Sequence, residues 1–102
     1  MTVKLVVLYT QPDDADAFHQ HYAGTHMPLV GKVPGLLRTE TGKVRAAIDG
    51  GEKTYCRVTE LYFADQAALQ AGFASDQGQA TAADYQKIAP AGSRMFVVRV
   101  DD

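Results

Sequence analysis

The chain contains three histidines, His19, His21 and His26, and they lie close together in the sequence with Tyr22 among them. Imidazole has an unperturbed pKa near neutrality, so a histidine on a half-buried helix can give or take a proton beside apolar walls. A neighbouring phenol can donate a hydrogen bond to an oxygen that becomes negatively charged. The segment from Phe18 to Leu29 is therefore the candidate site, and its residue types indicate acid–base chemistry.

His26 and Tyr22 form the candidate catalytic pair. At about 100° per residue, His26 falls on the apolar arc of a helix four residues after Tyr22, so both side chains point the same way. Desolvation lowers the pKa of an imidazole, which suits a general base that removes a carbon-acid or phenolic proton. Tyr22 would donate a hydrogen bond to the developing enolate oxygen. The alternative is a core histidine whose ring nitrogen bonds a carbonyl group in the turn before Pro28.

Further aromatic and basic side chains are candidate ligand contacts. Tyr9, Phe18 and Tyr62 are suited to the walls of a pocket, although the two tyrosines suit an interface equally well. His21 lies outside the apolar arc of an ideal helix. This position favours a structural or solvent-facing role unless a loop folds over it, in which case His21 contacts the ligand.

Glu60 is a further candidate ligand contact, because it interrupts an otherwise apolar strand face. A buried carboxylate needs a cation or a hydrogen-bond donor. Glu60 therefore either forms a structural ion pair, acts as a catalytic acid, or orients a histidine. The candidate partners for an ion pair are Arg57, Arg94 and Arg99.

The pattern of ligand-type residues predicts neither a metal site nor a cofactor. His19 and His26 would lie about 10 Å apart along a helix axis, which is too far to share one metal ion. The single cysteine, Cys56, belongs to no zinc-binding pattern and is expected to pack as a small apolar side chain. Glycine-rich nucleotide-binding fingerprints are absent from the sequence.

Composition narrows the class of protein. A chain of 102 residues and 11.0 kDa is expected to form one domain, residues 1–102, and its formal net charge of −2 argues against a nucleic-acid partner. No apolar run approaches the roughly 18 residues that a membrane span needs, and no signal peptide is apparent. With one cysteine and no disulfide, the sequence predicts a cytoplasmic protein.

The order of elements predicts a fold. Apolar runs and turn signals indicate strands at 3–9, 36–48, 55–63 and 95–100, and helices at about 15–33, 66–73 and 76–89, with a kink near Thr25, which can cap the second half. This β-α-β-β-α-β order is that of the α+β ferredoxin-like split fold. It has a four-stranded antiparallel sheet, and here the second helix is broken in two.

The predicted fold leaves one face of the sheet bare. Right-handed crossovers place all helices on one side, yet the first and last strands are apolar on both faces. The bare face would be a larger apolar patch than soluble monomers usually expose. A second copy of the chain would cover it, so the sequence predicts a homodimer built as a dimeric α+β barrel.

Several of these residues, in this order, resemble the EthD family of dimeric α+β barrels. The resemblance rests on Tyr9, Pro12, Asp14, Phe18, His21, Tyr22, His26, Pro28 and Leu29, then Pro34-Gly35-Leu36, Glu60-Leu61-Tyr62-Phe63, and Ser75, Gly78 and Gln79. It implies a ferredoxin-like dimer with a small cavity between helices and sheet. Carried over residue by residue, it points to His21, Tyr22, His26 and Pro28, with Glu60 as an addition.

The resemblance also implies a class of activity. EthD itself is associated with ether degradation, and the wider fold group includes isomerases, polyketide cyclases, lyases and cofactor-free monooxygenases. The implied function is a cofactor-independent enzyme that transfers protons on a small enolisable or aromatic compound. The alternatives are a binding protein for a hydrophobic metabolite and a structural accessory dimer.

Overall fold

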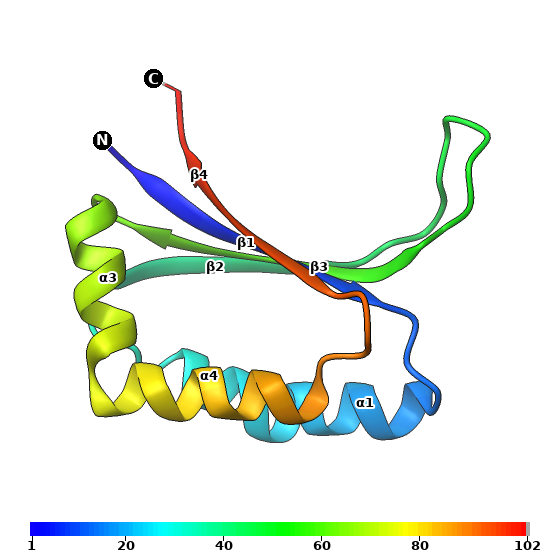
Figure 1. Ribbon diagram of the computed structural model, residues 1–102, viewed down its shortest axis with the longest axis horizontal. Coiled ribbons are helices and arrows are strands. Elements are labelled where there is room, and N and C mark those ends of the chain that lie inside the picture. The colour runs from blue at the N-terminus through cyan, green and yellow to red at the C-terminus, as the bar shows by residue number, and fades with distance from the viewer. Residues whose placement is uncertain (102) are drawn as a thin grey trace.

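The computed structural model describes residues 1–101 as one antiparallel sheet with all helices on one face (Figure 1). The four strands have the order β2-β3-β1-β4, which confirms the predicted ferredoxin-like fold. The elements are β1 (Val3–Thr10), α1 (Ala15–His21), the π-helical turn η1 (Tyr22–His26), α2 (Met27–Val30), β2 (Leu36–Lys43), β3 (Tyr55–Phe63), α3 (Gln66–Ala74), α4 (Asp76–Ile88) and β4 (Arg94–Arg99).

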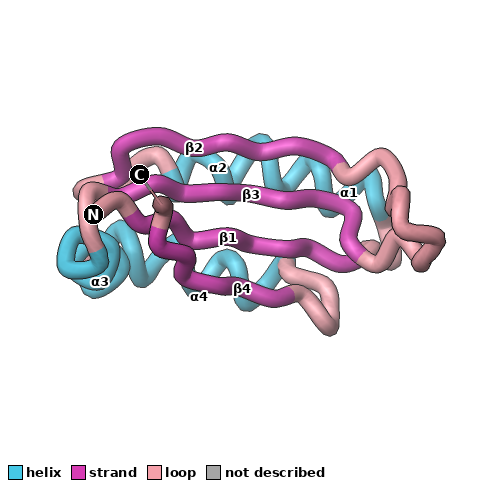
Figure 2. Tube along the Cα trace, turned by 90° about the horizontal axis from the view of Figure 1, so that it is seen from above, coloured by secondary structure: helices cyan, strands magenta, loops and turns pink. Residues whose placement is uncertain are grey.

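The central strand β1 pairs with β3 on one side and with β4 on the other, so that Leu5 lies opposite both Leu61 and Val97. Side chains alternate between the two faces of a strand. Val7 and Tyr9 therefore point toward the helices and are buried, whereas Lys4 points to the other face, which we call the open face. Figure 2, viewed from above the sheet, shows all the helices on its far side.

The first helical segment contains a widened turn. Asp14 caps α1 by accepting a hydrogen bond from the Ala17 amide at 3.0 Å. Pro28 lacks an amide hydrogen and cannot continue regular helical bonding, and the Met27 amide instead bonds to the Tyr22 carbonyl, five residues back. The break expected near Thr25 is thus a π-helical turn, and the expectation that Thr25 caps the second half is wrong, since α2 begins without a side-chain cap.

The second helix is broken in two, as predicted. Asp65 caps α3, and the Ser75 hydroxyl caps α4 by accepting from the Gly78 amide at 3.0 Å. The two helices meet so closely that a β-carbon on Gly78 would stand 2.5 Å from the Cα of Phe73 and closer still to the carbonyl oxygen of Gly72. This contact explains why the Ser75–Gly78 motif requires glycine.

The second strand is shorter than predicted. β2 ends at Lys43, and residues 44–54 form a loop before β3 begins at Tyr55. The turn formers Asp49, Gly50 and Gly51 lie inside this loop, and Ile48 is fully exposed. Residues 45–54 are all exposed, so this segment has no buried face to hold it in the sheet, and it forms a long connection instead.

Candidate functional site

A cavity of about 260 Å³ lies between the sheet and the helices. Its lining is mostly apolar, and His26, Tyr9, Thr59 and Gln86 are among its polar residues. Because Gln86 of α4 and Met95 of β4 are exposed and also line the cavity, it reaches the surface between these two elements. The remaining lining residues are Leu5, Val7, Val30, Leu61, Leu69, Phe73, Thr81, Ala82 and Tyr85.

One carboxylate holds two of the three histidines. His26 Nδ1 lies 2.9 Å from Oδ2 of Asp84, and His21 Nε2 lies 2.8 Å from Oδ1 of the same side chain. An ionised carboxylate only accepts hydrogen bonds, so His26 carries its proton on Nδ1. Its Nε2 is then a lone pair, 3.5 Å from the Tyr9 hydroxyl.

The π-helical turn makes this arrangement possible. His21 and His26 are five residues apart, and on a regular α-helix such residues diverge around the axis. The widened turn η1 has the longer i to i+5 repeat, so both imidazoles reach the same carboxylate on α4. His21 is half-buried and contacts Asp84. It is neither on the cavity wall nor fully exposed to solvent.

The electrostatics favour a neutral base next to a charged carboxylate. Desolvation lowers the pKa of His26 below its ordinary value, and the bonded Asp84 opposes this shift without cancelling it. For Asp84, burial pushes the pKa up, but the hydrogen bonds from His21 and His26 outweigh burial and leave the pKa below its ordinary value. Asp84 therefore stays ionised while His26 stays neutral at neutral pH.

Aromatic side chains surround the other side of His26. The Tyr9 ring makes edge contacts with Phe18 and Tyr22 at centroid distances of 5.4 and 5.7 Å, and the Tyr22 ring lies 5.9 Å from the His26 ring. Burial raises the pKa of Tyr9, which keeps its hydroxyl protonated as a donor. Phe18 is buried in this cluster and supports the site from behind Tyr9, without lining the cavity.

The sequence predicts that the Tyr22 hydroxyl faces the bound compound, but Tyr22 is not among the residues that line the cavity. It lies 2.5 Å from the Thr59 hydroxyl and 2.8 Å from that of Thr41, on the floor formed by β3 and β2. Thr59 does line the cavity. Tyr22 and His26 are neighbours, as their spacing predicted, but the tyrosine reaches the cavity only through a threonine.

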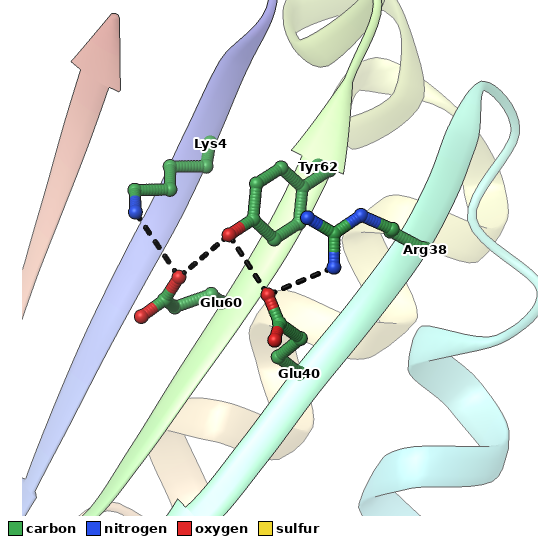
Figure 3. A network of polar contacts seen from close by, with 5 residues as sticks. All are labelled: Lys4, Arg38, Glu40, Glu60 and Tyr62. Atoms are coloured by element: carbon green, nitrogen blue, oxygen red, sulfur yellow. Dashed lines mark hydrogen bonds and ion pairs between the residues drawn. The ribbon is translucent and has the colours of Figure 1, made fainter. Parts of the chain in front are cut away.

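Glu60 and Tyr62 lie on the open face of the sheet (Figure 3). His26 lies on the other side of the sheet, where it lines the cavity. The Tyr62 hydroxyl donates to Glu60 at 2.9 Å and to Glu40 at 3.0 Å. Lys4 forms an ion pair with Glu60 at 3.1 Å. The prediction that an arginine would be the partner of Glu60 is therefore wrong. These contacts, completed by an Arg38–Glu40 pair at 2.8 Å, form what we call the open-face network.

Sequence reasoning missed Asp84 and Thr59. Asp84 occupies the same helix face as the buried Thr81 and the half-buried Ile88. Burying an aspartate on that face is costly unless a hydrogen-bond donor faces its carboxylate. That interruption of a buried face is a signal that the sequence contains. Within residues 1–101, no group of three or more acidic, histidine or cysteine side chains is arranged to hold a metal ion.

The fold and the site together define a small ferredoxin-like protein with an apolar cavity and a carboxylate-held histidine. The family model described as the EthD domain matches residues 11–90. The chain therefore belongs to the EthD family, as its residues indicated. Across the described residues, no helix has both the length and the apolar character that crossing a membrane requires.

Two similar proteins cover nearly the whole chain. An uncharacterized 11.0 kDa protein from the thcB–thcC intergenic region of Rhodococcus erythropolis is 35% identical over 93 residues, 91% of this chain and 89% of its own. The crystal structure of an EthD family protein from Bacillus halodurans C-125 is 34% identical, with a TM-score of 0.92, and the match covers 99% of this chain and 100% of that one.

More distant structures share the fold alone. A hydroxynitrile lyase from Passiflora edulis is 11% identical, with a TM-score of 0.80 over 99% of this chain and 94% of its own. A protein from Jannaschia sp. CCS1, described as a dimeric ferredoxin-like protein of unknown function, is 18% identical, with a TM-score of 0.72 over 98% of this chain and 100% of its own.

Proposed function

We propose that this protein is a cofactor-independent enzyme that moves a proton on a small, neutral, enolisable or phenolic compound, with His26 as the base. The observation that carries the proposal is the placement of His26. It is 4% exposed, it lines the cavity, and its Nδ1 is held by the Asp84 carboxylate. An imidazole fixed in this way presents one nitrogen lone pair to whatever occupies the cavity.

The residues support each part of a proton transfer. His26 Nε2 accepts the proton from the bound compound, and the imidazolium that forms is stabilised by Asp84 at 2.9 Å. The second bond, from His21, holds the carboxylate in place while the charge on His26 changes. Tyr9, 3.5 Å from Nε2, is a further hydroxyl at the point of transfer.

The lining also indicates which compounds enter. None of the residues that line the cavity in the described part of the chain is a lysine or an arginine. An anionic compound would lose its hydration there without gaining a counter-ion. A volume of about 260 Å³ fits a compound of one or two rings and excludes larger ones. The Passiflora edulis protein of the same fold is a hydroxynitrile lyase, which supports an enzyme over a structural protein.

Deuterium exchange tests this proposal. 2-Tetralone is a neutral two-ring ketone with acidic α protons, and NMR in D₂O follows their loss. We expect the protein to accelerate the exchange and the His26→Asn variant to abolish it while remaining folded. The asparagine amide replaces the Nδ1 donor to Asp84 and removes Nε2.

The two other candidate functions give different results in the same experiment. A protein that binds 2-tetralone, detected as a rise in melting temperature, without accelerating exchange would be a binding protein for hydrophobic metabolites. A protein that neither binds nor exchanges this ketone or related lactones and phenols would be a structural dimer. Either result would refute proton transfer as the function.

We also propose that the chain forms a homodimer through the open face. Val6, Phe96 and Val98 lie side by side there, and Phe96 and Val98 are 41% and 36% exposed. A second copy would cover this patch, and the Jannaschia protein of the same fold is described as dimeric. A cytoplasmic location is part of the same proposal and is supported by the single, unpaired cysteine.

A further inference from the structure

Arg57 is a charged side chain that the fold buries. It is 9% exposed, and among residues 1–101 no carboxylate lies within ion-pair distance of its guanidinium. The guanidinium lies 4.3 Å over the Tyr22 ring, and its Nε is buried without a hydrogen-bond partner. Burying a cation without a carboxylate partner costs free energy, so the position of this positive charge calls for an explanation.

The guanidinium donates the first hydrogen bond in a connected group of three hydroxyls. Arg57 Nη1 donates to the Thr41 hydroxyl at 2.9 Å. The hydroxyls of Thr41, Tyr22 and Thr59 then lie within hydrogen-bond distance of one another, at 2.8 Å for Tyr22–Thr41, 2.5 Å for Tyr22–Thr59 and 3.1 Å for Thr41–Thr59. Because the first donor carries a positive charge, each hydroxyl further along the chain is polarised to donate.

A count of protons identifies the free end of this chain. Arg57 donates to Thr41, whereas either hydroxyl can be the donor in the Thr41–Tyr22 and Tyr22–Thr59 contacts. We assign Thr41 as the donor to Tyr22 and Tyr22 as the donor to Thr59, because this order continues from the charged donor. The Thr59 proton is then held only by the longest contact, 3.1 Å back to Thr41. Of Thr41, Tyr22 and Thr59, Thr59 is the one residue that lines the cavity.

We propose that Thr59 donates this proton in a hydrogen bond to an oxygen atom of the bound compound, and that Arg57, Thr41 and Tyr22 are positioning residues that polarise it. The inference rests on the proposed function and narrows its substrate class. The compound carries a phenolic or carbonyl oxygen, which Thr59 contacts while His26 takes a proton. Negative charge that develops on the oxygen meets a donor backed by a guanidinium.

The test uses two probes that differ by one hydroxyl group, 4-nitrophenol and nitrobenzene. Both carry the nitro group, so a difference between them isolates the hydroxyl. The neutral and ionised forms of 4-nitrophenol absorb at different wavelengths, so its pKa can be measured while it is bound. The variants are Thr59→Val, which keeps the shape and removes the donor, and Thr59→Ser, which keeps the donor. Thr81→Val is the matched control, because Thr81 also lines the cavity while its hydroxyl already donates to the Gln77 carbonyl at 2.9 Å.

We expect Thr59→Val to weaken 4-nitrophenol binding by about 3- to 10-fold and to leave nitrobenzene binding within about twofold, as for one hydrogen bond. It should also raise the pKa of the bound phenol, since the phenolate loses its donor. Thr59→Ser and Thr81→Val should behave as the wild type. Thr41→Val, at an exposed position, leaves Thr59 intact but cuts the link to Arg57, and should raise the bound pKa by a smaller amount.

Two results would overturn the inference. Unchanged affinity and unchanged bound pKa in both Thr59→Val and Thr41→Val would exclude a polarised donor, and equal losses for both probes would show that Thr59 acts by packing. The proposed function would survive either result. If the wild type bound neither probe, the proposed function would fail and this inference with it. If Thr59→Val does not fold, Thr41→Val alone decides through the bound pKa.

Discussion

Replacing Asp84 by asparagine is the sharpest test of the site, because one side chain connects three elements. Asp84 on α4 is 7% exposed and accepts from His21 and His26, which lie on either end of η1. Asparagine has nearly the same shape, but only one oxygen that accepts. Its amide nitrogen would then face the N–H of one imidazole, donor against donor.

The magnitude follows from the bonds that are lost. A hydrogen bond to a charged group contributes about 1.5–3 kcal/mol, and the variant loses one such bond and weakens the other. Burying an amide costs less than burying a carboxylate, which offsets part of the loss. We expect Asp84→Asn to lower the free energy of unfolding by about 2–4 kcal/mol, which corresponds to a drop in melting temperature of roughly 10–25 °C for a domain of this size.

Urea unfolding across a range of pH measures this effect, with the exposed Asp13→Asn as the control. The pKa of Asp84 is lowered in the folded protein, so its stabilisation is fully present above the ordinary value of 3.8 and is lost as pH falls through the folded pKa. The difference between wild type and variant should therefore close below pH 3.8. A variant within about 0.5 kcal/mol of the wild type at neutral pH would refute the two-histidine bridge.

Three further predictions test other parts of the structure. Gly78→Ala should destabilise by at least about 1–3 kcal/mol, because the new methyl group meets the carbonyl of Gly72, whereas Gly24→Ala, with open space around it, should be neutral or stabilising by up to about 1 kcal/mol in thermal unfolding. Phe96→Glu should leave the fold intact and shift sedimentation toward the monomer, and an unchanged dimer would place the interface elsewhere. The folded-state pKa of His26 is lowered from 6.5, so wild-type stability should decline as pH falls below that value, and His26→Asn should remove that part of the decline in acid-titration calorimetry.

Much of the fold could be predicted because local signals agreed with the final arrangement. Short stretches of sequence mark the ends of several elements. These stretches include the β-branched run of β1 and the capping residues of α1 and α4, which are Asp14 and Ser75. The broken second helix was visible for the same reason. The end of β2 could not be predicted, since every residue of this strand after Leu36 is exposed and no buried face imposes an alternating pattern on the sequence.

The site was predicted only in part, because its key contacts join distant parts of the chain. His26 was placed on the apolar arc from its own helix, but its partner Asp84 is 58 residues away. The face that carries Glu60 depended on which side of β3 the helices cover, and both sides contain apolar residues. His21 could not be placed with regular helical geometry, since its orientation depends on the π-helical turn.

That turn has a consequence for any shortened relative of this chain. Removing one residue between His21 and His26 would leave the two histidines four residues apart, a spacing at which a regular α-helix keeps both side chains on one face. The shorter chain would therefore keep both imidazoles directed at α4 without a widened turn between them. At the spacing of five residues found here, a regular α-helix and hydrogen bonds from both histidines to Asp84 exclude one another, and this chain keeps the two hydrogen bonds.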